Sequence, residues 1–145
     1  MKSAVEINLP VATVVELFND KNNFAAWKKN FISFEYVSGT PGEAGSVTKL
    51  VFKRVTMFET ILKKNLPASI TESYDHQRNG KTVMVHEATN RFSKLKDDKT
   101  LIESEMNITK VVGFLPRMMM KLMAGAAKKY AQDQLNQFKV FAEKK

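Results

Sequence analysis

Residues 114–142 read FLPRMMMKLMAGAAKKYAQDQLNQFKVFA, and this stretch decides the fold class. Its apolar side chains recur at helical spacing on one face, namely at Leu115, Met118, Met119, Leu122, Ala126, Tyr130, Phe138 and Phe141. A helix of about 29 residues is about 43 Å long, at about 1.5 Å per residue. A helix of that length needs a partner along most of its course, and the rest of the chain must supply it.

The chain before this helix is dominated by segments with the two-residue periodicity of half-buried strands. We expect strands at residues 5–9, 31–38, 47–52, 54–63, 69–76, 83–92 and 101–109. Asn79-Gly80 between two such runs is a strong hairpin signal, and the glycines of residues 39–45 indicate another turn. Short connections favour pairing between sequence neighbours, so the strands are expected to form an antiparallel meander.

Two short helices are expected between the first and second strands. Pro10 ends the first strand and is tolerated in the first turn of a helix, which we place at residues 11–19. Asp20 can cap a second helix within residues 20–30, where Phe24 and Trp27 share one face.

The order of elements predicts an α+β fold in one domain, residues 1–145. A curved seven-stranded antiparallel sheet is expected to carry the long C-terminal helix on its concave face, because a sheet must bury one face. A twisted sheet and a helix curve differently, so a space is expected between them.

Composition excludes several classes of site. The chain has no cysteine, which rules out disulfides, thiolate metal sites and a cysteine nucleophile. No run of about 18 apolar residues is present. The first residues lack a signal-peptide core, because Glu6 and Asn8 interrupt it. We therefore expect a cytoplasmic protein.

Several segments, in this order and spacing, are similar to those of one known family. They are residues 5–10 leading into 14–20, Trp27, residues 39–46, residues 59–61 with Leu66-Pro67, and residues 137–143. Over essentially its whole length the chain resembles the START-like (SRPBCC) superfamily, in its branch of polyketide cyclase/dehydrase and lipid transport proteins, which have the helix-grip fold. The resemblance implies binding of a lipid, a sterol, a polyketide or a similar small molecule. Some relatives are cyclases, while others are ligand sensors or partners of chaperones, so fold does not settle function.

Strand alternation predicts which side chains face the enclosed space. On the last strand, carboxylates at 103 and 105 belong in water, so the opposite face is taken as the inner one. A three-residue turn at 97–99 would pair Phe92 with Ser104 and Ala88 with Ile108, whereas a two-residue turn would place Glu87 inward. A loop at 79–81 puts Tyr74 opposite His86 and also turns Glu72 inward.

From these faces we predict a set of ligand-binding residues on the sheet and the long helix. The set is Trp27, Phe34, Tyr36, Leu50, Phe52, Tyr74, His86, Ala88, Asn90, Phe92, Ser104, Met106, Met118, Met119, Leu122 and Met123. The methionines suit a wall that adapts to its ligand, because a thioether is flexible and polarizable.

Few residues are candidates for chemistry. His86 with Tyr74 is the candidate for acid–base catalysis, whereas His76 lies beside a hairpin turn and is expected to be exposed. Two histidines without cysteine predict no metal site, and no phosphate-binding or dinucleotide-binding motif is present. We expect no cofactor.

The net charge of +8, from 23 Lys and Arg against 15 Asp and Glu, allows an anionic partner. The basic residues alternate with apolar core positions instead of exposed aromatic ones, which disfavours nucleic acid. The basic residues near the C-terminus are compatible with an ordinary solvated helix face. Arg117, Lys121, Lys128 and Lys129, with Phe114, Leu115 and Met120, also allow a transient contact with an anionic membrane. The identity of a protein partner, if there is one, is left open.

The leading hypothesis is a non-catalytic binder or carrier of a small hydrophobic ligand, with His86, Tyr74 and Asn90 orienting a polar group of that ligand. One alternative is a cyclase or dehydratase-like enzyme that uses His86. Another is a protein-interaction module whose cavity has collapsed.

Overall fold

Seven strands form one antiparallel sheet in the computed structural model, which describes residues 1–113 and 117–145, the side chain of Arg117 excepted. The strands are β1 (Lys2–Ile7), β2 (Phe31–Ser38), β3 (Val47–Phe52), β4 (Thr56–Asn65), β5 (Ser69–Arg78), β6 (Lys81–Lys96) and β7 (Lys99–Val111). Their spatial order is β1-β7-β6-β5-β4-β3-β2. The predicted meander is confirmed for β2 to β7, and β1 joins it at the outer edge of β7.

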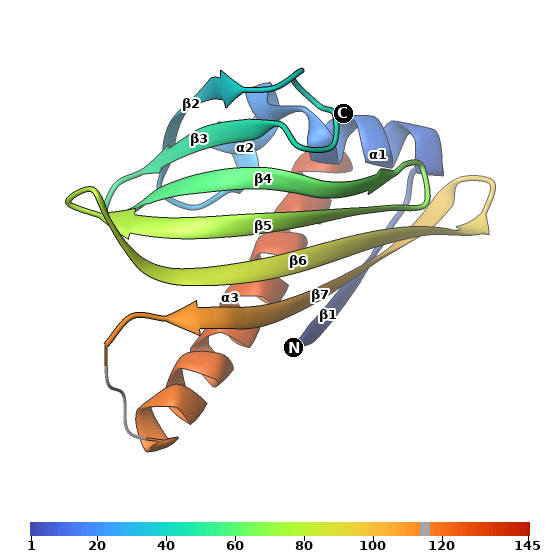
Figure 1. Cartoon of the computed structure of the whole chain (residues 1–145). Coiled ribbons are helices and arrows are strands. Elements are labelled where there is room, and N and C mark those ends of the chain that lie inside the picture. The colour runs from blue at the N-terminus through green and yellow to red at the C-terminus, as the bar shows by residue number, and fades with distance from the viewer. Residues whose placement is uncertain (114–116) are drawn as a thin grey trace.

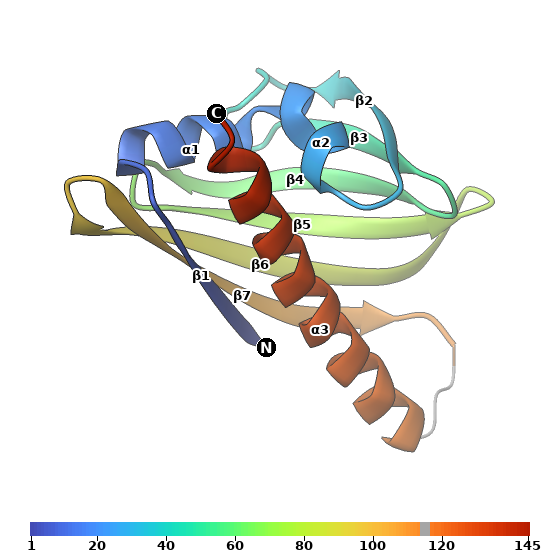
Figure 2. The same ribbon diagram turned by 180° about the vertical axis from the view of Figure 1, so that it is seen from behind.

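The long C-terminal helix α3 (Arg117–Ala142) crosses the concave side of the sheet obliquely (Figure 2). Its C-terminal half lies over the sheet beside the short helices, and its N-terminal half extends past the edge formed by β7 (Figure 1). This arrangement confirms the predicted α+β helix-grip fold. The predicted start of the helix, Phe114, lies outside the described residues.

Two short helical segments close one end of the sheet. Helix α1 (Val11–Asn19) follows Pro10 and buries Val14 and Phe18, as its periodicity predicts. The second segment is shorter than expected: a 3₁₀ turn, η1 (Lys21–Asn23), and helix α2 (Phe24–Trp27). The Asp20 side chain accepts a hydrogen bond from the Asn22 backbone N–H at 2.9 Å, which starts the 3₁₀ turn.

The β5–β6 hairpin turns at Asn79-Gly80, where both residues have positive φ (53° and 75°), as a tight two-residue hairpin turn requires. Lys81 belongs to β6 instead of the loop. A bulge beside His76 then shifts the register, so that Tyr74 lies opposite His86. The predicted pair is confirmed, although the turn is shorter than expected.

The β6–β7 pairing was predicted two residues out of register. Phe92 lies opposite Ile102, and Ala88 lies opposite Met106. The turn holds two residues, and a bulge between Lys94 and Lys96 shifts the pairing by one residue. As a result, each β6 side chain lies on the same face of the sheet as a three-residue turn would have placed it. The predicted faces therefore hold while the predicted partners on β7 do not.

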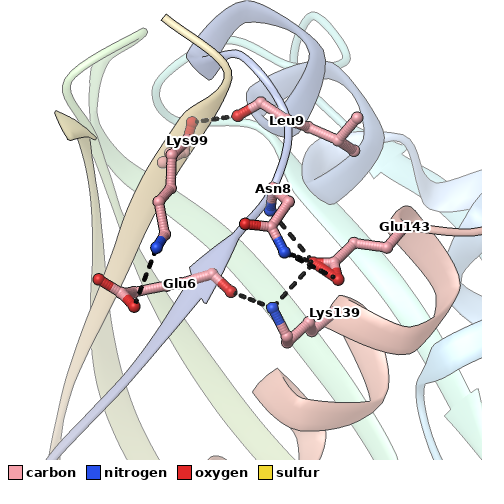
Figure 3. Close-up of polar contacts among 7 residues, drawn as sticks. Glu6, Asn8, Leu9, Lys99, Lys139 and Glu143 are labelled. Carbon is pink, nitrogen blue, oxygen red and sulfur yellow. Dashed lines mark hydrogen bonds and ion pairs between the residues drawn. The ribbon is translucent and has the colours of Figure 1, made fainter. Parts of the chain in front are cut away.

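Helix α3 is fastened to the outer edge of β1. Gln132 exchanges two hydrogen bonds with the backbone of Ala4, at 3.1 and 2.8 Å. Further along, Lys139 Nζ donates to the Glu6 carbonyl at 2.7 Å, and the Asn8 backbone N–H donates to Glu143 Oε2 at 3.1 Å (Figure 3). These side chains satisfy backbone groups that an edge strand would leave open.

The core is densest where α1, α2 and the C-terminal half of α3 meet the sheet. Phe18, Trp27 and Phe138 form a triangle of rings with centroid distances of 5.0 to 5.2 Å. Phe138 is fully buried. This triangle sets the distance between helix and sheet at one end of the molecule.

Candidate functional site

A cavity of about 330 Å³ lies between the concave face of the sheet and the helices. Most of its lining side chains are apolar, and a smaller group is polar or charged. The lining residues are Phe18, Asn19, Lys21, Phe24, Trp27, Lys28, Gly42, Leu50, Phe52, Met57, Glu59, Ile61, Lys64, Leu66, Ile70, Glu72, Tyr74, His76, Met84, His86, Ala88, Asn90, Ser104, Met106, Ile108, Ala127, Tyr130, Ala131, Gln134 and Leu135.

The sheet supplies this lining in rows, because directly paired residues of antiparallel strands share a face. One row runs from Met57 through His76 to Met84, and the next from Glu59 through Tyr74 to His86. A third row runs through Ile61, Glu72, Ala88 and Met106. The period-two pattern of β4, β5 and β6 thus places both apolar and charged side chains on one surface.

More than half of the predicted ligand-binding residues line the cavity. They are Trp27, Leu50, Phe52, Tyr74, His86, Ala88, Asn90, Ser104 and Met106. Eight of these nine lie on β3, β5, β6 or β7, where alternation alone assigns the face.

Three predicted residues of the sheet do not line the cavity. Phe34 and Tyr36 lie on the edge strand β2, and Tyr36 is half exposed. Phe92 is buried and packs on Phe18 with a centroid distance of 5.4 Å, but it does not line the cavity. In each case the position along or across the sheet, and not the face alone, decides access to the cavity.

The predicted residues of the long helix do not line the cavity either. They are Met118, Met119, Leu122 and Met123. All four lie in the part of α3 that extends past the sheet (Figure 1). Met118 and Leu122 are 74% and 68% exposed. The helix contributes Ala127, Tyr130, Ala131, Gln134 and Leu135 to the wall instead.

A buried ion pair lies in the wall. Lys21 Nζ is 2.9 Å from Glu59 Oε1, and the Glu59 side chain is only 2% exposed. Burial raises the pKa of Glu59, but the positive charges of Lys21 and Lys28 outweigh that effect and hold the pKa below its usual value. Burial likewise lowers the pKa of Lys21, and the charge of Glu59 outweighs it and raises the pKa. Both groups are therefore charged at neutral pH.

Glu72 behaves differently from its neighbour. It is 6% exposed, and burial together with the negative charge of Glu59 raises its pKa well above the usual value. The same causes, burial first and then the charges of Glu72 and Glu59, raise the pKa of Tyr74 well above its usual value. Glu72 and Tyr74 thus hold their protons at neutral pH, beside the Glu59 carboxylate.

Lys28 provides a second positive charge at the cavity. Its ammonium lies 4.2 Å from the ring centroid of Phe24 and 5.0 Å from that of Trp27, within the range of cation–π attraction. Burial lowers its pKa, while the charges of Glu59 and Glu72 oppose that shift. The side chain is held over the aromatic rings of α2 beside the ligand space.

The two histidines form a pair. His76 Nε2 and His86 Nδ1 are 2.7 Å apart, and the Tyr74 ring stacks on His86 with a centroid distance of 4.8 Å and an angle of 14°. His76 is half-buried and lines the cavity, so the prediction that it is exposed is wrong. The bulge in the β5–β6 hairpin keeps it on the concave face.

Burial, followed by the nearby charges of His76 and Lys28, lowers the pKa of His86 to about 3. Acid–base catalysis is most efficient with a pKa near the working pH. A histidine that stays neutral throughout the physiological range suits hydrogen bonding to a ligand better than proton transfer.

We expect this shift to make the protein less stable in mild acid. Below pH 6.5 the unfolded chain protonates His86, whereas the folded chain does not until about pH 3. Between pH 7 and pH 5 this difference removes about 2 kcal/mol from the free energy of unfolding. In His86→Gln that part of the loss should vanish, as urea denaturation at both pH values would show. Glu72 acts in the opposite direction and His76, whose pKa burial also lowers, in the same direction, and both are present in both proteins. The difference between the two proteins therefore reports on His86, and an equal loss in the variant would contradict the assigned pKa.

Sequence reasoning missed most of the charged wall. Glu59 lies between Met57 and Ile61 on β4, and these two apolar neighbours at two-residue spacing are the signal that could have placed it inward. Lys21 and Lys28 belong to irregular or very short segments, where no periodicity assigns a face.

Among residues 1–113 and 117–145, no three His, Asp or Glu side chains converge so as to hold a metal ion. None of the helices in that part of the chain has the length and apolar character needed to cross a membrane.

The chain is similar in structure to several solved proteins. A conserved protein from Geobacillus kaustophilus aligns with a TM-score of 0.76 at 14% identity, covering 99% of this chain and 94% of its own. A START superfamily protein from Mycobacterium smegmatis aligns with 0.74 at 16% identity, covering 99% and 97%. The Zhui aromatase/cyclase from Streptomyces sp. R1128 aligns with 0.72 at 16% identity, covering 99% and 92%. At these identities the likeness shows the fold.

No curated protein matches the sequence. The family described as "Polyketide cyclase / dehydrase and lipid transport" matches residues 1–143. A START-like fold, a cavity under the C-terminal helix and a family match over nearly the whole chain agree with one another. The chain belongs to the polyketide cyclase/dehydrase and lipid transport family.

Proposed function

We propose that this protein binds a small, largely apolar molecule in the cavity between the sheet and α3. The observation that carries the proposal is the composition of the wall: an apolar surface with buried polar groups among it, such as Glu59 on β4 and Glu72 and Tyr74 on β5. Such a wall is typical of sites that take affinity from apolar burial, at about 25 cal/mol per Å², and orientation from a few polar contacts.

The predicted alternatives fit the wall less well. A module with a collapsed cavity would leave no space, whereas about 330 Å³ is present here. An enzyme that uses His86 as its acid or base needs a group that changes charge near neutral pH, and the pKa of His86 is about 3. Ligand binding without catalysis therefore agrees with both the open cavity and the low pKa of His86.

The single tryptophan of the chain makes the proposal easy to test. Trp27 is 4% exposed and lines the cavity, so its fluorescence reports on the cavity. Titration with decan-1-ol should change that fluorescence in a saturable way with a stoichiometry of about one. No change in fluorescence, together with no heat in a calorimetric titration, would count against an apolar binding site.

A separate proposal concerns the N-terminal half of α3, as a contact with anionic membranes. Met118 and Leu122 are largely exposed there, and Lys121, Lys128 and Lys129 are exposed on the same half of the helix. Apolar side chains flanked by lysines match the chemistry of an anionic lipid surface. Phe114 and Leu115, which the sequence also assigned to this contact, lie outside the described residues.

We expect the double charge reversal Arg117→Glu with Lys121→Glu to reduce co-sedimentation with vesicles of phosphatidylcholine and phosphatidylglycerol several-fold, because each basic residue near such a surface contributes about 1 kcal/mol. The matched control is Lys94→Glu with Lys96→Glu, at the exposed end of the β6–β7 hairpin. Unchanged co-sedimentation of the first variant, or an equal loss in the control, would rule out this contact.

A further inference from the structure

The positive charges of the cavity wall outnumber its negative charges. Among the described residues, the ion pairs at the cavity join Lys21 to Glu59 and, at its rim, Lys64 to Glu43. Lys28 takes part in no ion pair and no side-chain hydrogen bond in that part of the chain; its ammonium contacts the rings of Phe24 and Trp27. One positive charge of the wall is left without a counter-charge.

The remaining acidic side chain of the wall does not supply that counter-charge. Glu72 lies one strand away from Glu59 and is almost fully buried beside it. Two carboxylates so close cannot both be ionised easily, and the raised pKa of Glu72 agrees with this. With neutral histidines, the described wall carries about one net positive charge.

The Lys28 side chain is partly buried. Removing an ammonium from water without an anion beside it is costly, and aromatic rings offset that cost only in part. A ligand with one negative charge would remove this cost. A phosphate monoester carries close to two negative charges at neutral pH and would overcompensate the site.

We propose that the molecule bound in the cavity is an amphipathic carboxylate, whose apolar body lies along the sheet and whose carboxylate pairs with Lys28. This inference rests on the proposed function and specifies the chemical class of its ligand. The site itself consists of Lys28 over the rings of Phe24 and Trp27, with the Lys21–Glu59 pair as a fixed neutral neighbour.

The test compares two probes of equal chain length, decanoate and decan-1-ol, by isothermal titration calorimetry at pH 7. The wild-type protein should bind decanoate roughly tenfold or more tightly than decan-1-ol, since a charge-assisted contact is added. Lys28→Met should lose this preference and bind the two probes with similar affinities. Lys28→Arg, which keeps the charge, should retain the preference for decanoate.

The matched control is Lys29→Met, which removes a charge from the neighbouring exposed residue and should leave both affinities unchanged. Equal binding of the two probes to the wild type, or a preference for decanoate that survives in Lys28→Met, would overturn the inference and leave the proposed function intact. If neither probe binds, the proposed function fails, and this inference fails with it.

Discussion

Replacing Ala88 with tryptophan is expected to abolish ligand binding in a protein that remains folded. Ala88 is buried at the centre of β6, with Glu72 opposite it on β5 and Met106 opposite it on β7. Its small side chain faces the cavity. An indole at this position would project into the space between the sheet and α3.

The expected loss of affinity for decan-1-ol is at least about a hundredfold, because most of the apolar surface available to the ligand would be taken by the indole. Overpacking a core typically costs about 1–3 kcal/mol, so thermal unfolding should remain cooperative. Calorimetric titration and a thermal melt measure the two effects separately.

The control is Glu87→Trp, which adds the same ring on the neighbouring residue of β6. Paired with Ser73 and Asn107, Glu87 faces the convex side of the sheet, and this variant should bind like the wild type. If Ala88→Trp kept its affinity, the cavity described here would not be the binding site.

Phe138→Ala is expected to have the largest effect on stability. Phe138 is fully buried, and its ring lies 5.0 Å from those of Phe18 and Trp27, measured between centroids. Truncating a buried phenylalanine costs about 3–5 kcal/mol, through lost burial and the cavity that remains. The loss would also free the C-terminal half of α3 from α1 and α2.

Urea denaturation followed by circular dichroism measures this loss. Val140→Ala, on the same helix but half exposed, should change the free energy of unfolding by less than about 0.5 kcal/mol. If Phe138→Ala does not fold, Phe138→Leu gives a smaller loss that can still be measured. A cost below about 1 kcal/mol for Phe138→Ala would show that the aromatic triangle does not hold the helix to the sheet.

Most of the fold could be predicted because its signals are local. Residues 31–38 and 47–52 match β2 and β3 to the residue, since aromatic and β-branched runs end there at turn residues. Bulges were not predictable in the same way. The bulges beside Lys94 and His76 shift strand partners by one residue, and no residue type in those stretches requires them.

The sequence predicts which side chains lie on the concave face of the sheet, but not which of them reach the cavity. Alternation assigned Tyr74, His86, Ala88 and Asn90 to the concave side, and all four line the cavity. Whether a concave residue reaches the cavity depends on the oblique course of α3, which leaves Met118 and its neighbours beyond the sheet (Figure 2). Long-range packing sets that course, and sequence periodicity carries no information about it.

The charged wall escaped prediction for a different physical reason. Burying a carboxylate is costly unless it is paired, so sequence reasoning places Glu59 in solvent by default, although strand alternation does turn Glu72 inward. The burial of Glu59 depends on Lys21, which precedes α2 and meets β4 only in the folded chain. A buried charge is inferred only when its partner is known, and here the partner is remote in sequence.

Native mass spectrometry tests the central claim most directly. The purified protein, alone and after incubation with decan-1-ol, should be measured beside Ala88→Trp under the same conditions. We predict a one-to-one complex for the wild type, lost on denaturation, and only the bare chain for Ala88→Trp. A wild-type protein that shows only its bare mass in both conditions would contradict a ligand-binding cavity between the sheet and α3.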